Sequence, residues 1–129
     1  MVAPRCVGRG WNHIVNRALQ YLSGMNSLEQ RWADHLDVLR AAGEIAEWRY
    51  EPLKLKLAGS TFYTPDFIVL HKDQHLSIDE VKGFWRDDAR VKLKVAAEMF
   101  PWWEFRAITQ RTKKAGGGWA IEQFGPKRP

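Results

Sequence analysis

The sequence predicts an α/β protein in which a mixed β-sheet is flanked by helices. Two segments with helical spacing of apolar residues come first, and three segments with strand character follow. A helix then separates the third strand from a fourth, and a strand–helix–strand connection usually joins parallel neighbours. The 129 residues fit one domain, 1–129, because two cores in so short a chain would each be marginally stable.

The first expected helix covers residues 11–22, where apolar residues recur at helical spacing before Ser23-Gly24. It makes residues 11–24 an N-terminal helical extension. Capping of the sheet and formation of a dimer face are two alternatives for its role.

The second expected helix covers residues 28–42. Ser27 and Gln30 fit a capping box at its start, and Gly43 fits the left-handed residue that follows a helix. One face of the helix is apolar and is expected to be buried, namely Leu28, Trp32, Leu36 and Leu39.

An antiparallel meander of three strands is expected after the helices. Residues 53–57 alternate leucine with lysine, which is typical of a strand with one wet face. Residues 62–70 are rich in aromatic and β-branched side chains, and residues 76–82 form the third strand. The polar residues 71–75 form the turn between the last two strands.

The remaining elements alternate between helix and strand. Residues 87–100 are helical up to Pro101, and residues 103–109 form the fourth strand. Residues 113–118 are too basic and too rich in glycine for a regular element, whereas residues 119–124 can pair as a last strand.

The charge balance favours a polyanionic partner. The chain has 20 Lys and Arg against 15 Asp and Glu, which gives a net charge of +5 and an isoelectric point near 9.6. No apolar run is long enough for a membrane span, and the N-terminus lacks the apolar stretch of a secretory signal. We therefore expect no membrane partner and a cytoplasmic location.

Cysteine and histidine are not expected to bind a metal. Cys6 is the single cysteine and cannot form an internal disulfide. The histidines do not repeat with a carboxylate at the spacing of a zinc site within one regular element; they are His13, His35, His71 and His75.

An aspartate in an apolar strand is the first sign of chemistry. Pro65-Asp66 precedes Phe67, Ile68 and Val69, so Asp66 is expected inside the second strand. A buried, unpaired carboxylate costs several kcal/mol, on the order of the desolvation penalty of an ion, and therefore requires a metal or a cationic partner. A strand-start aspartate that reaches solvent is the structural alternative.

The third strand presents an acid and a base on one face. Glu80 and Lys82 share parity and lie about 6.6 Å apart along the strand, whereas Asp79 points the other way. An ordinary ion pair between Glu80 and Lys82 is the structural alternative.

Together these residues can form a metal centre. Asp66 and Glu80 at 4 Å would repel by about 4 kcal/mol at an effective dielectric constant near 20, and a divalent cation reverses that repulsion. Oxygen ligands without a thiolate favour Mg²⁺ or Mn²⁺. Lys82 can orient or deprotonate the attacking water, or neutralise charge on a phosphate.

In this sequence Pro65-Asp66 is followed, after thirteen residues, by Glu80-Val81-Lys82. This pattern resembles the signature of the PD-(D/E)XK nuclease superfamily. The order of predicted elements over residues 27–109 is similar to its restriction-endonuclease-like αβββαβ core, leaving 110–129 as a basic, glycine-rich loop and a C-terminal strand. The resemblance implies that Asp66, Glu80 and the carbonyl of Val81 hold the cation and that Lys82 assists catalysis. It also implies a supporting role for Glu29, whose alternative is a first-turn helix glutamate.

Four segments together resemble a family of small phage-encoded proteins in that superfamily. They are Ser27-Leu28-Glu29, Ala42-Gly43-Glu44-Ile45, Asp66-Phe67 and Glu80-Val81-Lys82-Gly83. The chain is also similar to Holliday-junction resolvases, which act as dimers on branched DNA. The resemblance implies a DNA endonuclease in phage recombination or DNA processing, located in the cytoplasm of a bacterial host and possible as a homodimer.

Basic residues after the motif are expected to contact DNA phosphates. Arg90 and Lys94 are spaced i,i+4 on one helix face, and the others are Arg86, Lys113 and Lys114. Solvation without a ligand is the alternative for each. Among the tryptophans, Trp85 is the best candidate to stack on a base or sugar.

Two other functions use the same residues. One is a DNA-binding or assembly protein that keeps the nuclease fold without turnover, although retained buried charges argue against it. The other is an RNA-cutting nuclease.

Overall fold

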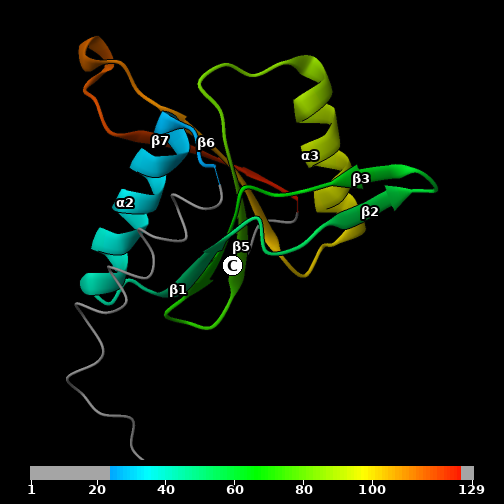
Figure 1. Cartoon of the computed structure of the whole chain (residues 1–129), viewed down its shortest axis with the longest axis horizontal. Coiled ribbons are helices and arrows are strands. Elements are labelled where there is room, and N and C mark those ends of the chain that lie inside the picture. The colour runs from blue at the N-terminus through cyan, green and yellow to red at the C-terminus, as the bar shows by residue number, and fades with distance from the viewer. Residues whose placement is uncertain (1–23, 126–129) are drawn as a thin grey trace, which may run out of the picture.

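The computed structural model describes residues 24–125, so the expected helix over residues 11–22 lies outside the described residues. Within them one mixed five-stranded sheet carries a helix on each face (Figure 1). The predicted α/β class is therefore confirmed. The elements run in the order α2 (Ser27–Ala41), β1 (Ile45–Tyr50), β2 (Leu55–Ala58), β3 (Thr61–Tyr63), β4 (Phe67–His71), β5 (Leu76–Val81), α3 (Asp87–Met99), β6 (Glu104–Gln110), the 3-10 helix η2 (Lys113–Ala115) and β7 (Trp119–Phe124).

The strand order across the sheet is β1-β4-β5-β6-β7. β4 is antiparallel to both of its neighbours, β1 and β5, whereas β5 and β6 are parallel, as is usual for strands joined by a helical crossover. β7 pairs with β6 in antiparallel fashion, which confirms the predicted last strand. The third strand of the chain's meander, β5, thus lies in the centre of the sheet.

The first strand of the meander differs from the prediction. Ile45–Tyr50 takes that place, whereas Leu55–Ala58 pairs with Thr61–Tyr63 in a separate hairpin that projects beside α3 (Figure 1). The alternation in β1 was obscured because the register shifts between Ile45 and Glu47, and such a bulge breaks the period of two.

The predicted strand over residues 62–70 is divided. β3 ends at Tyr63 and β4 begins at Phe67, so the prediction that Asp66 lies inside a strand is wrong. Pro65 has no N–H to donate to a ladder and favours an interruption at this point. Asp66 lies just ahead of β4, where its backbone carbonyl accepts the N–H of Glu51 at 2.8 Å.

The start of α2 is capped one residue earlier than predicted. Asn26 Oδ1 accepts the N–H of Glu29 at 2.9 Å, and a Glu29 carboxylate oxygen accepts the N–H of Asn26 at 3.0 Å. The predicted box of Ser27 and Gln30 is therefore wrong, because Asn is as good a cap as Ser and Glu follows it at the required spacing. The predicted helix end is confirmed, since Gly43 has a φ of +78°.

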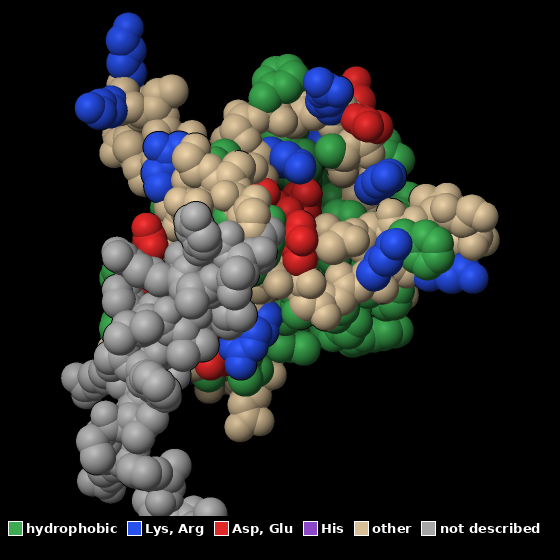
Figure 2. All heavy atoms as spheres, viewed as in Figure 1, with side chains coloured by type: hydrophobic (Ala, Val, Ile, Leu, Met, Phe, Trp, Pro, Cys, Tyr) green, Lys and Arg blue, Asp and Glu red, His purple; other side chains and the backbone are tan. Residues whose placement is uncertain are grey.

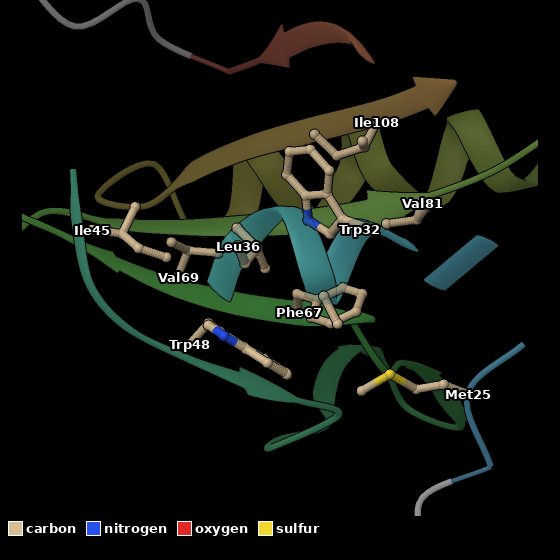
Figure 3. Close-up of a cluster of buried hydrophobic side chains, with 10 residues drawn as sticks. Met25, Trp32, Leu36, Ile45, Trp48, Phe67, Val69, Val81 and Ile108 are labelled. Carbon is tan, nitrogen blue, oxygen red and sulfur yellow. The ribbon is translucent and has the colours of Figure 1, made fainter. Parts of the chain in front are cut away.

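Each face of the sheet has its own apolar cluster. Under α2, Trp32 and Leu36 pack on Phe67, Val69 and other residues of the sheet (Figure 3). On the other face, α3 and the hairpin contribute to a second buried cluster, composed of Leu55, Tyr63, Ile78, Leu93, Ala96, Ala97, Phe105, Ala107 and Phe124. None of the helices within residues 24–125 combines the length and apolar character that crossing a membrane requires.

Candidate active site

Asp66 is held against the end of β5. Its Oδ2 accepts the backbone N–H of Val81 at 2.9 Å, and only 6% of the residue's surface is exposed. Phe67 is paired with Asp79 in the sheet, so the antiparallel register continues with Asp66 opposite Glu80. The two acids are therefore neighbours across β4 and β5.

Glu80 is buried among polar partners. Tyr63 donates its hydroxyl to Glu80 Oε2 at 2.8 Å, and the Lys82 ammonium lies 3.2 Å from Oε1. Glu80 is 7% exposed, whereas the Lys82 side chain is 38% exposed and reaches the surface. Glu80 and Lys82 thus lie on one face of β5, as predicted. They also form the ion pair that was considered as the structural explanation of their spacing.

Asp79 faces the opposite side of the sheet, as its parity predicts. Arg106 donates to its two carboxylate oxygens at 2.7 and 2.6 Å, and Ser77 donates to Oδ1 at 3.0 Å. Asp79 is fully buried. This aspartate belongs to a structural ion pair beneath α2, so the predicted parity of Asp79 is confirmed.

Glu29 joins the acidic cluster from the start of α2. It caps the helix through Asn26, and its Oε2 also accepts the Tyr50 hydroxyl at 2.9 Å. Its charge contributes to raising the pKa of Asp66, so the two carboxylates interact. Glu29 is buried, so the alternative of a solvated first-turn glutamate is wrong, and its supporting role at the site stays a prediction.

The backbone of Val81 completes the oxygen set. In an extended strand, the N–H and C=O of one residue point to the same side. Because the N–H of Val81 donates to Asp66, its carbonyl oxygen also faces that side, beyond the paired part of β4. Asp66, Glu80 and the Val81 carbonyl are the described groups that could hold a hard divalent cation.

Burial and neighbouring charges shift the pKa values of this cluster. Burial, together with the Glu80 carboxylate, raises the pKa of Asp66 to about 8, although the N–H of Val81 acts in the opposite direction. Burial lowers the pKa of Lys82, but Glu80 and Asp66 outweigh burial and hold that pKa above its ordinary value. Lys82 is therefore a stable ammonium in the metal-free protein, which favours charge neutralisation over proton abstraction among its predicted roles.

Two tyrosines of the site were not found from sequence. Burial raises the pKa of the Tyr63 hydroxyl above its usual range, as does Glu80, and the pKa of Tyr50 rises for the same reasons with Glu29 as the neighbour. Both hydroxyls remain protonated donors. Tyr63 lies three residues before Asp66, and this proximity is the sequence signal that could have identified Tyr63 as part of the site.

Acidic side chains gather in a hollow between α2 and α3, with basic side chains around it (Figure 2). β5 and β6 run parallel, so the segments that follow them leave the sheet at the same end, and Asp66 lies at this end beside Val81. Those segments include three of the five residues predicted to contact phosphate. These three side chains are exposed, and they are Arg86, Lys113 and Lys114.

The other two predicted contacts lie elsewhere. Arg90 is half-buried and pairs with Glu122 of β7 at 3.0 Å. Lys94 lines a pocket with Glu98 and Phe124, and Phe124 pairs with Phe105 near the beginning of β6. The structure therefore does not bring Lys94 to the acidic cluster, because α3 runs back toward the opposite end of the sheet.

Phe84, which follows β5, has an exposed aromatic side chain. It is 82% exposed, whereas Trp85 is half-buried, donates to Thr109 at 3.2 Å and packs on the second core cluster. These contacts favour a structural role for Trp85 over the predicted stacking on a base or sugar.

No family model, curated protein or solved structure matches the chain.

Proposed function

We propose that the protein is a Mg²⁺- or Mn²⁺-dependent endonuclease that hydrolyses phosphodiester bonds in DNA. The observation that carries the proposal is the buried pair of carboxyl groups, Asp66 and Glu80, at the end of β5 with the Lys82 ammonium 3.2 Å from Glu80. Two adjacent carboxylates with a backbone carbonyl form a site that gains stability from a divalent cation.

Each residue of the site has a distinct task in this proposal. Asp66, Glu80 and the carbonyl of Val81 hold the cation, which would supply charge neutralisation at the scissile phosphate. Lys82, an exposed ammonium beside Glu80, stabilises negative charge that develops on the phosphate oxygens. Glu29 and the two tyrosine hydroxyls keep the carboxylates oriented.

The surroundings of the site suit a nucleic acid. Arg86 and the η2 lysines follow β5 and β6 at the end of the sheet where the carboxylates lie. Such side chains bind phosphates without reading sequence. The β2–β3 hairpin adds the exposed Lys54 and Lys56, and Tyr63 on this hairpin contacts Glu80. A polyanion bound by these groups would pass the metal ligands.

The sheet order gives further support for a restriction-endonuclease-like core. One helix, three antiparallel strands, a second helix and a parallel strand follow one another in the main sheet, with Asp66 and Glu80 at the second and third of those strands. This is the arrangement that the resemblance to PD-(D/E)XK nucleases implies. From the same resemblance we propose branched DNA as the preferred substrate, in phage recombination or DNA processing.

The test is cleavage of labelled four-way junction, linear duplex, single-stranded DNA and RNA by the full chain. Each substrate is incubated with Mg²⁺, Mn²⁺ or EDTA. Metal-dependent cutting of the junction supports the proposal, whereas equal cutting of linear duplex removes the preference for branches. Preferential cutting of RNA would favour the RNA nuclease, and binding without cutting would favour the non-catalytic DNA-binding protein.

A further inference from the structure

A second group of metal-ligating side chains lies at the other end of the sheet. His71 ends β4, His75 lies in the turn before β5, and Glu104 begins β6. One ligand atom from each of them lies within 4.8 Å of the other two. Asp66 immediately precedes β4 and His71 ends it, so five steps along the strand, about 16 Å, separate this group from the acidic cluster.

The β4–β5 turn brings the two histidines together. The N–H of His71 donates to the carbonyl of His75 at 3.0 Å, and Gln74 adopts a left-handed conformation with a φ of 71°. The two imidazole rings are stacked, with centroids 4.1 Å apart and planes inclined by 3°. The parallel pairing of β5 and β6 then brings Glu104 to His75, 2.8 Å from its Nε2.

Other side chains orient these ligands. Asp73 binds Nδ1 of His75, so a metal ion would bind at Nε2 and replace the direct contact of this nitrogen with Glu104. His71 contacts the Ser77 hydroxyl at 2.8 Å through Nε2, and Ser77 in turn donates to Asp79. A carboxylate or hydroxyl on the second ring nitrogen is the arrangement that commonly supports metal-binding histidines.

We propose that His71, His75 and Glu104 bind a zinc-class divalent cation and thereby fasten the β4–β5 turn to the start of β6. Two imidazoles and one carboxylate are a ligand set that Zn²⁺ takes with a water in the fourth position, whereas Mg²⁺ prefers oxygen ligands. Tetrahedral ligands of Zn²⁺ lie about 3.4 Å apart, so His75 Nε2 and Glu104, which are 2.8 Å apart, would separate slightly to admit the ion, and His71 would turn toward it. The histidine spacing did not predict this site because Glu104 comes 29 residues after His75.

The test uses the full chain freed of metal with a chelator and titrated with Zn²⁺ in a calorimeter and with Co²⁺ in a spectrophotometer. The expected result is one equivalent of Zn²⁺, the visible absorption of four-coordinate Co²⁺ and a higher melting temperature with Zn²⁺. Glu104→Gln and His75→Gln should each weaken Zn²⁺ binding by about 100-fold or more.

Two further variants make the outcome decisive. Asp66→Asn should bind Zn²⁺ like the wild type, which separates this site from the proposed endonuclease centre. If His75→Gln fails to fold, Asp73→Asn replaces it with an expected loss of about 10-fold, since it removes the group that orients His75. Absence of stoichiometric Zn²⁺ binding, or equal binding by Glu104→Gln, would overturn the proposal.

Discussion

The Tyr63 hydroxyl donates to Glu80 at 2.8 Å across a separation of 17 residues. This bond ties the β2–β3 hairpin to the central strand of the sheet. It also gives a buried carboxylate a neutral donor that does not cancel its charge, so Glu80 stays available to a cation.

Tyr63→Phe should therefore lower the free energy of unfolding by about 1–2 kcal/mol in the absence of metal, because Glu80 loses a buried hydrogen bond. The loss should shrink when Mg²⁺ is added, since the cation would then satisfy the same carboxylate. Urea denaturation with and without Mg²⁺ measures both quantities. An equal loss in the two conditions would contradict a metal at Glu80.

Asp66 predicts how stability depends on pH. Its pKa in the folded protein is about 8, above the unfolded value near 4, so the folded state binds more protons between these pH values. The Asp66 contribution to stability is therefore complete below about pH 4 and is lost as pH rises toward 8. Mg²⁺ should offset this loss most strongly near pH 8, because the cation displaces the proton.

Asp66→Asn provides the control for that prediction. The amide oxygen can still accept the N–H of Val81, whereas the charge is removed. At pH 8 without metal, the variant should be more stable than the wild type by about 1 kcal/mol or more. Thermal unfolding from pH 5 to pH 9 tests this, and identical pH dependence in both proteins would count against the raised pKa.

Asp79→Asn should have the opposite effect on stability. The charge of Arg106 is buried and depends on Asp79 for its two short hydrogen bonds. Breaking a buried ion pair by removing one partner costs about 3–5 kcal/mol, so this variant should be strongly destabilised at neutral pH. Similar stability of Asp66→Asn and Asp79→Asn would refute the distinct roles of these neighbouring acids.

Lys82→Ala should lower the rate of cleavage by about 100-fold or more while leaving the fold intact, because a charge-stabilising group at the phosphate is lost. Binding of Mg²⁺ should become tighter, since the ammonium no longer competes for Glu80. Lys72→Ala is the matched control, because Lys72 forms an exposed pair with Glu44 at 3.4 Å. Cleavage rates and Mg²⁺ calorimetry of both variants provide the measurement.

The sequence predicted those features of the site that depend on local periodicity. The period of two placed Glu80 and Lys82 on one face and Asp79 on the other, and the structure confirms this arrangement. The parallel strand after α3 followed from the handedness of crossovers and is confirmed as well.

Features that depend on irregular backbone or on distant contacts could not be predicted. The bulge after Ile45 concealed β1, and a lysine-rich hairpin was interpreted as a strand of the main sheet. Tyr50 meets Glu29 across 21 residues, and Glu104 meets His75 across 29, so only the folded chain shows these pairs. Arg90 was predicted to contact phosphate from its helical spacing with Lys94. Its ion pair with Glu122 could not be foreseen, because Glu122 lies 32 residues further along the chain.

The most direct test of the proposed function is single-turnover cleavage of a labelled four-way junction by the wild type and Asp66→Asn across a Mg²⁺ titration. Asp34→Asn, a change of an exposed helix residue, serves as the matched control. We expect the wild type and Asp34→Asn to cut with the same dependence on Mg²⁺, and Asp66→Asn to fold but not cut. Cleavage by Asp66→Asn at the wild-type rate, or cleavage by the wild type in EDTA, would contradict a metal-dependent nuclease built on Asp66 and Glu80.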